Sequence, residues 1–128
     1  MRSRGGEIYA VACSACHQPD GRGSEGVGPP LAGSAWVTGS PDRLARIVLH
    51  GMRGPVEVRG KVWNQEMPAM GFFGDRDLAA ALTFIRQAWG NRAPAVTADA
   101  VAAARWATAD RRDSWTAEEL LHLSRARR

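Results

Sequence analysis

The run Cys-Ser-Ala-Cys-His at positions 13–17 constrains this chain more than any other feature of its sequence. Cys13 and Cys16 are the only cysteines among 128 residues, so they pair with each other, bind something together, or stay free. Residues 18–39 follow directly and hold so many glycines and prolines that regular structure is excluded over most of the stretch. A loop of this length inside a compact domain is usually functional. Something other than secondary structure must therefore order it.

The C-x-x-C-H spacing is that of covalent c-type haem attachment. Two thiols three positions apart at the end of a helix can each add to one vinyl group of a porphyrin, which places His17 beneath the iron as an axial ligand. A structural zinc site requires four ligands, and the chain has no second cysteine pair. A thioredoxin-like redox pair expects a preceding strand, and a structural disulfide across three positions is rarer still. We therefore predict one haem c per chain, thioether-linked through Cys13 and Cys16.

Capping residues and apolar periodicity predict a chain made almost entirely of helices and loops. The expected helices before the tail span residues 6–13, 41–50 and 75–89. The second has Ser40 as its N-cap and Pro41 at its first position, and it ends near His50, whose cation is favoured close to a helix C-terminus. The third repeats apolar residues at helical spacing. Valines on both sides of Gly60 can pair as a short hairpin between these two helices.

The tail also carries helix signals. Thr97 is a suitable cap for an alanine-rich helix, and a last helix is expected to begin at Thr116. Glu119, three residues on, completes a capping box, and Trp115 can pack on Leu120 as a hydrophobic staple. These features predict that the tail folds into helices.

The expected fold class is all-α: three core helices around one haem in residues 1–92, and a helical extension over residues 93–128. No stretch approaches the roughly 20 apolar residues that span a bilayer, and no apolar segment typical of a signal peptide follows Met1. The formal charge of +4 comes from 17 basic and 13 acidic residues without one long basic run. We therefore expect a solvated basic surface, no nucleic-acid partner and no transmembrane segment.

A low-spin haem used for electron transfer needs a second axial ligand, and methionine is the candidate. Met67 precedes Pro68 in an irregular segment just before the third helix, and the proline stiffens the backbone that presents the sulfur. Met70 is the nearest rival and is expected to pack in the core, while Met52 is the weakest candidate. We predict His17 and Met67 as the iron ligands.

At this point the chain resembles the class I, mono-haem cytochromes c. The motifs that carry the resemblance occur in the family's order: Gly6-x-x-Tyr9, the C-x-x-C-H run, Gly28-Pro29-Pro30-Leu31 and Met67-Pro68. Together with Trp63-Asn64 and Trp89-Gly90-Asn91, they are similar to the cytochrome domains of bacterial membrane-bound and periplasmic dehydrogenases. The resemblance covers about residues 5–91.

The resemblance assigns roles to individual residues. Pro30 matches the proline whose carbonyl accepts the Nδ1 hydrogen of His17, a bond that orients the ring. Gly6 and Tyr9 match the positions where the first helix crosses the last core helix closely, against Phe84. A side chain at Gly6 would hold these helices apart.

The edge of the haem pocket is expected to hold polar donors. Trp36 or Trp63 can donate its indole hydrogen to a haem propionate, although packing is the alternative role for both. Asn64 can donate a hydrogen bond to the Met67 sulfur, or it is an ordinary turn residue.

These expectations define an electron-transfer c-type cytochrome domain that is not itself an enzyme. A haem enzyme or gas sensor with a labile sixth ligand is the alternative, but no distal His or Arg stands near Met67. The expected partners are redox proteins: a dehydrogenase donor, or an oxidase or cytochrome acceptor. Attachment of haem c takes place outside the cytoplasm, so we expect a periplasmic or otherwise extracytoplasmic location, reached with a leader that is not part of this sequence.

Overall fold

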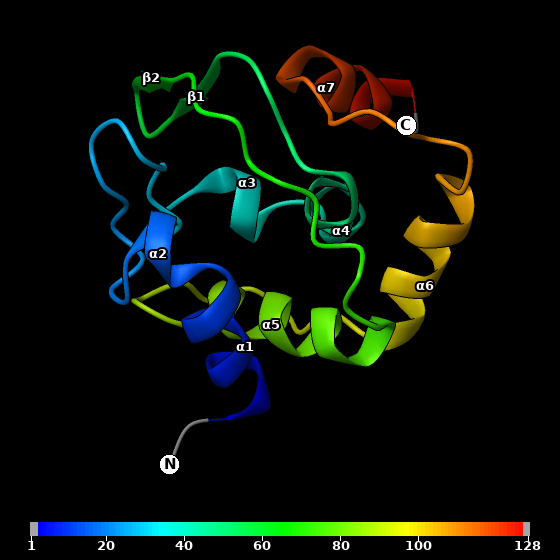
Figure 1. Cartoon of the computed structure of the whole chain (residues 1–128), viewed down its shortest axis with the longest axis horizontal. Helices are drawn as coiled ribbons and strands as arrows, with labels where there is room; N and C mark the ends of the chain where they lie inside the picture. The colour runs from blue at the N-terminus through cyan, green and yellow to red at the C-terminus, as the bar shows by residue number, and fades with distance from the viewer. Residues whose placement is uncertain (1–2, 127–128) are drawn as a thin grey trace.

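The computed structural model of the chain describes residues 3–126 and confirms a mostly helical fold with one small sheet (Figure 1). Its elements are α1 (Arg4–Ala12), α2 (Ser14–His17), α3 (Ala35–Thr38), α4 (Pro41–His50), β1 (Val56–Val58), β2 (Lys61–Trp63), α5 (Asp75–Gln87), α6 (Ala98–Ala107) and α7 (Ala117–Ala126). α5 packs against α1 and α6, and α4 packs against α6. Within residues 3–126, no helix has the length and apolar character needed to cross a membrane.

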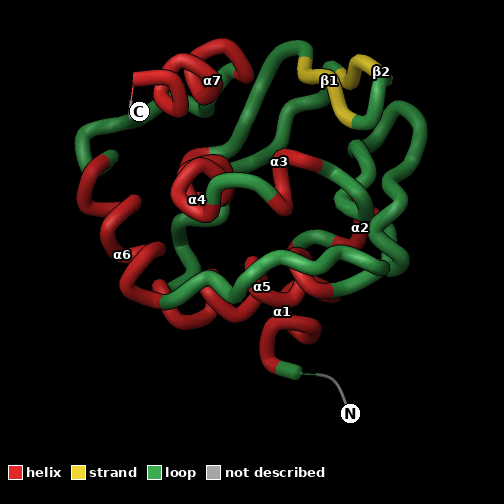
Figure 2. The backbone as a smooth tube through the Cα atoms, turned by 180° about the vertical axis from the view of Figure 1, so that it is seen from behind, coloured by secondary structure: helices red, strands yellow, loops and turns green. Residues whose placement is uncertain are grey.

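The long loops and the C-terminal helices occupy different regions around α4. Both views place α2 and the β1–β2 hairpin on one side of α4, together with most of the loop structure, α6 on the other side, and α7 above α4 (Figures 1 and 2). The hairpin forms where the sequence predicts it, with Val58 paired to Lys61. Arg59 and Gly60 both have positive φ, 55° and 82°, as a two-residue hairpin turn requires.

The crossing of α1 and α5 is closest at Gly5, one residue before the expected position. A Cβ at Gly5 would lie 2.1 Å from the Ala80 carbonyl oxygen, whereas one at Gly6 would lie 3.3 Å from the Phe84 ring. Backbone cannot move aside as easily as a ring, so Gly5 sets the distance between the helices. Tyr9 packs at this crossing against Phe84, with ring centroids 5.6 Å apart, as expected.

Two of the expected helices end differently from the sequence prediction. α1 stops at Ala12, and Cys13 separates it from the short α2. α5 stops at Gln87 instead of residue 89. Trp89 has a φ of 55°, which is incompatible with a helix, and its ring turns back onto Tyr9 at a centroid distance of 5.1 Å.

One buried arginine, Arg86, connects the start of the tail to the core. Arg86 is only 2% exposed, and its guanidinium donates to the carbonyls of Val37, Gly39 and Pro94. Burial lowers the pKa of Arg86. Because it bridges the α3–α4 turn and the segment leading to α6, this side chain fixes where the tail begins.

The predicted caps of the tail are confirmed. The Thr97 hydroxyl accepts from the Ala100 amide at the start of α6. At α7, the Thr116 hydroxyl accepts from the Glu119 amide, and the Glu119 carboxylate accepts from the Thr116 amide at 3.0 Å. Trp115, just before this box, is buried in one cluster with Leu120, as the staple predicts.

His50 differs from its expected state. Its Nε2 lies 2.7 Å from the Thr108 hydroxyl, which itself donates to the Ala104 carbonyl, so Nε2 carries the hydrogen. Burial lowers the pKa of His50, and Arg111, Arg105 and Arg46 lower it further. These effects outweigh the favourable interaction of a cationic His50 with the C-terminus of α4, so the neutral form of His50 is preferred.

Candidate haem site

An apolar cavity lies among the end of α1, the long loops, α4 and α5. Most of its wall is aliphatic, and it includes Leu44, Ile47, Val48, Leu78, Leu82 and Ile85. The chemically distinctive residues in the wall are Cys13, Cys16 and His17 from the motif, and Met52, Met67 and Met70 from the segments around β1 and β2. Folding therefore brings the predicted attachment residues and all the candidate methionine ligands to one cavity.

His17 ends α2 and is held as a neutral ring. It is 9% exposed, and its Nδ1 lies 2.7 Å from the Pro29 carbonyl oxygen. Burial lowers the pKa of His17, and the weaker opposing effect of the Pro29 bond does not reverse this. A neutral ring that donates from Nδ1 keeps the Nε2 lone pair free for a metal.

The acceptor for His17 is Pro29 and not Pro30, so the role implied by the resemblance moves by one residue. Consecutive prolines are extended, and their successive carbonyls point in different directions, about three to a turn. Only one carbonyl of the pair can face the histidine. Pro30 keeps a place in the cavity wall.

The two cysteines are not joined to each other by a disulfide and differ in exposure. Cys13 is half-buried, and burial, followed by the charge of Cys16, raises the pKa of its thiol to about 11. Cys16 is exposed. Among the described residues, 3–126, no three His, Cys, Asp or Glu side chains gather as a metal site would require.

Hydrogen bonds within the protein order the long loop that follows His17. The amides of Leu31 and Ala32 both donate to the Gly21 carbonyl. Asn91 is 7% exposed; its Oδ1 accepts from the Gly33 amide, and its Nδ2 donates to the carbonyls of Leu31 and Ile85. In the sequence Asn91 stands out only as part of the Trp89-Gly90-Asn91 run, so this tether was missed.

Two buried polar atoms near β2 lack hydrogen-bond partners, and only one of them belongs to a residue of the cavity wall. The Trp63 indole nitrogen and the Gln65 side-chain oxygen are buried without a hydrogen-bond partner, and Gln65 lines the cavity. Buried polar groups normally have partners, so the Trp63 indole nitrogen is a donor that a polar group of a ligand can use. Haem, which is apolar in its ring and charged at its propionates, fits both the aliphatic wall and this donor.

Two predicted pocket residues do not fill the expected role. The Trp36 ring lines the cavity, but its indole nitrogen already donates to the Glu57 carbonyl at 3.0 Å. Asn64 is exposed and absent from the cavity wall, where its neighbour Gln65 lies instead. In a strand end, adjacent side chains alternate in direction, so the choice between 64 and 65 depends on the register of the hairpin. Nothing in the sequence marks Gln65.

A cavity with a C-x-x-C-H helix on its wall, an oriented neutral histidine and methionines in a following loop defines a c-type cytochrome domain. The comparisons agree: residues 2–85 match the family described as cytochrome c oxidase, cbb3-type, subunit III, and the chain belongs to that family. The family implies haem c as the cofactor and electron transfer as the function.

The chain is also similar to individual cytochromes. It is 37% identical over 91 residues to cytochrome c-552 of Thermus thermophilus, covering 68% of this chain and 69% of the relative. It is 39% identical over 108 residues to the gluconate 2-dehydrogenase cytochrome c subunit of Pantoea cypripedii, covering 79% of this chain but 24% of the relative. For the cytochrome c subunit of the quinone alcohol dehydrogenase of Gluconobacter oxydans the identity is 36%, over 70% of this chain and 19% of the relative. The chain thus spans only a fraction of the dehydrogenase subunits it matches.

Proposed function

We propose that this domain carries single electrons with one haem, thioether-linked through Cys13 and Cys16 and ligated by His17 and Met67. The observation that carries the proposal is the shared cavity: the thiols, the oriented histidine and the Met67 segment all line it. Bound there, the haem iron would alternate between Fe(II) and Fe(III), taking up and releasing one electron. Neutral His and Met ligands and an apolar wall both raise the reduction potential.

Met67 is preferred over the other methionines because Pro68 follows it and stiffens the backbone that presents its side chain. Its amide and carbonyl both pair with Met52, at 2.8 and 3.1 Å, and Pro68 follows directly. This leaves the Met67 side chain on a fixed segment at the cavity wall. Met70 also lines the cavity, and both Met67 and Met70 pack against the main core cluster, so the choice between them is left to the experiment below.

The propionate edge is assigned to the Trp63 indole donor, with Gln65 nearby in the cavity wall. Both have buried polar atoms that lack partners in the protein. The Lys61 ammonium lies 4.6 Å from the centre of the Trp63 ring and is ion-paired with Glu25. A carboxylate placed here would satisfy the Trp63 donor.

The proposed unit of function comprises a haem domain, residues 1–92, and an extension, residues 93–128. The family match ends at residue 85, which supports this division. The electron donor is a dehydrogenase, on the strength of the similarity to dehydrogenase cytochrome subunits. The location is extracytoplasmic, because haem c is attached there. An oxidase or a second cytochrome would accept the electrons.

The test is the absorption spectrum of the holoprotein, including the weak near-infrared band of a methionine sulfur bound to Fe(III). We expect the band in the wild-type protein, its loss in Met67→Ala and its retention in Met70→Ala, which is the matched control. Met67→Ala should also bind carbon monoxide rapidly in the ferrous state. Loss of the band in Met70→Ala alone would transfer the ligand role to Met70. A wild-type protein with no such band, and with open carbon monoxide binding, would favour the sensor or enzyme alternative.

A further inference from the structure

The segment that carries Met67 is not held by its own neighbours alone. Met52 pairs with Met67 on one side and with Trp115 on the other, in two isolated bridges. The Trp115 amide donates to the Gly51 carbonyl at 2.9 Å, and the Arg53 amide donates to the Trp115 carbonyl at 2.8 Å. The Met52 segment thus lies between Trp115 and the proposed iron ligand, although 48 positions separate 67 and 115 in the sequence.

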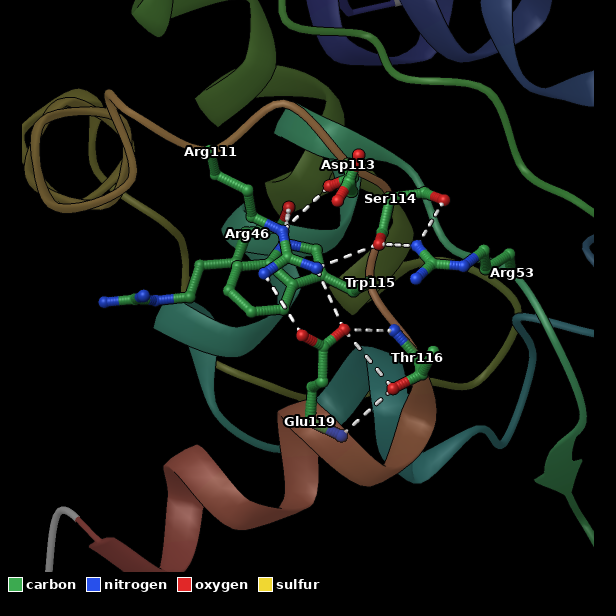
Figure 3. A network of polar contacts seen from close by, with 8 residues as sticks. All are labelled: Arg46, Arg53, Arg111, Asp113, Ser114, Trp115, Thr116 and Glu119. Atoms are coloured by element: carbon green, nitrogen blue, oxygen red, sulfur yellow. Dashed lines mark hydrogen bonds and ion pairs between the residues drawn. The ribbon is translucent and has the colours of Figure 1, made fainter.

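Trp115 is itself fixed from several directions (Figure 3). It is 5% exposed, and its indole nitrogen donates to the Arg46 carbonyl of α4 at 2.9 Å. The Arg111 guanidinium lies 3.4 Å from the centre of its ring, and Leu120 packs in the same buried cluster. Met52 and Met67 pack against that cluster. The anchor and the ligand segment therefore share both backbone and side-chain contacts.

Polar side chains fasten the backbone on each side of Trp115 (Figure 3). The Arg53 guanidinium donates to the Ser114 carbonyl and, at 3.0 Å, to the Ser114 hydroxyl. Arg111 donates to the same carbonyl at 2.9 Å and forms an ion pair with Glu119. Glu119 in turn closes the capping box at Thr116. Hydrogen bonds and an ion pair therefore hold residues 111–119 in place beside Trp115.

A second contact from the extension reaches the segment beyond Met67. The Arg105 guanidinium donates to the carbonyls of Gly71 and Phe73, both at 2.8 Å, and pairs with Asp75. The residues from Met67 to Phe73 are consequently bounded by the extension at both ends, through Met52 at the first and Arg105 at the second.

We infer that the extension positions the sixth ligand: Trp115, acting through Met52, holds the Met67 segment so that its sulfur stays at the haem. Trp115 is a positioning residue, because it acts on Met67 through another residue. The inference rests on the proposed ligation by Met67. An extension with this role sets how readily the iron site opens, and so how far the domain remains a pure electron carrier.

The test compares Trp115→Phe with Trp106→Phe in the full-length holoprotein. The Trp115 variant keeps an aromatic ring in the cluster but loses the bond to the Arg46 carbonyl. Trp106 lies in the same extension and is 84% exposed, so the same substitution there is a matched control. The measurements are amide hydrogen exchange at Met52 and Met67, and the pH at which the near-infrared Met–Fe(III) band disappears.

We expect Trp115→Phe to speed exchange at the two methionine amides roughly fivefold, as loss of one buried hydrogen bond implies. Exchange in α1 and α5 should be unchanged. When the pH is raised, the near-infrared Met–Fe(III) band should disappear at a lower pH in the variant than in the wild type. Trp106→Phe should match the wild type in both measurements. Uniformly faster exchange in all elements, with the band as robust as before, would show a merely structural role and overturn the inference.

The two proposals fail separately. If Met67→Ala keeps the near-infrared band, the ligand assignment is wrong, whatever Trp115 does. If Met67→Ala loses the band while Trp115→Phe changes neither the band nor the exchange of Met52 and Met67, the ligand assignment stands and the positioning role does not.

Discussion

Two sides of the cavity are held differently: the His17 wall, formed by residues 17–31, and the Met67 wall, formed by residues 51–53 and 67–73. The contacts that hold them differ in their separation along the sequence. On the His17 wall, the ring donates to Pro29, twelve residues away, and Leu31 donates to Gly21. On the Met67 wall, the nearest neighbour is Met52, which is secured by Trp115. One wall is thus built mainly from a local segment, while the other needs the end of the chain.

This difference has a physical consequence for the two iron ligands. Forming the His17 wall costs little loop-closure entropy, because its contacts join residues that are close in the sequence. This wall can therefore form as soon as its own segment folds. The Met67 wall depends on contacts spanning more than sixty residues, such as that between Arg53 and Ser114. Local openings should therefore release the methionine side before the histidine side.

The largest expected effect is at Gly51, where the Met67 wall is tightest. Gly51 has a φ of +82°, and a Cβ there would lie 2.4 Å from the Met67 carbonyl oxygen. Strain and overpacking together should make Gly51→Ala less stable by about 4 kcal/mol, measured by denaturant unfolding of the holoprotein. The near-infrared Met–Fe(III) band should also be lost.

Gly54 separates the two causes. Its φ is +78°, but nothing lies within 4 Å of the position where a Cβ would stand. Gly54→Ala should therefore cost only the conformational strain, about 1 to 2 kcal/mol, and keep the band. Equal losses in the two variants would mean that contact with the Met67 backbone is unimportant.

Asn91 offers a way to break the comparison, because it is a distant contact on the His17 wall. Its side chain is buried and bonds Leu31, Gly33 and Ile85. Asn91→Ala leaves these groups without partners and should lower the free energy of unfolding by about 3 kcal/mol, measured by chemical denaturation. Exposed Asn64→Ala is the control and should stay within about 0.5 kcal/mol of the wild type. A loss at Asn91 no larger than at Asn64 would mean that the His17 loop is held by local contacts alone.

The same contrast explains what could be predicted from the sequence. The attachment motif, the hairpin around Gly60 and the caps at Thr97 and Thr116 are local patterns, in which each residue type has a direct physical reason for its position. All were found. The exact acceptor for His17 was missed by one residue, because the direction of a proline carbonyl depends on the path of the loop.

The contacts that hold the Met67 wall could not be predicted in this way. No pattern in the sequence links Trp115 to Met52, since their pairing is made by backbone atoms that every residue has. The neutral state of His50 was missed for a similar reason. Its helix position is local information, but its burial against Thr108 and the nearby arginines is tertiary.

The smallest expected effect is a pH dependence at His50, which joins α4 to the extension beside the Met67 wall. Its folded-state pKa lies below the ordinary value of 6.5, first because of burial and then because of Arg111, Arg105 and Arg46. Below about pH 6.5 the unfolded chain binds a proton at His50 that the folded chain does not. The full stability is therefore present above pH 6.5 and falls as the pH decreases toward the lowered pKa.

His50→Gln removes this proton but keeps a side-chain amide that can donate to the Thr108 hydroxyl. We expect the variant and the wild type to unfold at similar denaturant concentrations at pH 7.5. Between pH 6.5 and 5 the wild type should lose stability more steeply, by less than about 1 kcal/mol in total. Working above pH 5 also keeps the Glu119 carboxylate, whose pKa is lowered mainly by its hydrogen bond to Arg111, ionised in both proteins. Parallel profiles over this range would show that His50 accepts its proton as readily in the folded protein as in the unfolded chain, and that the Met67 wall is no more sensitive to acid than the His17 wall.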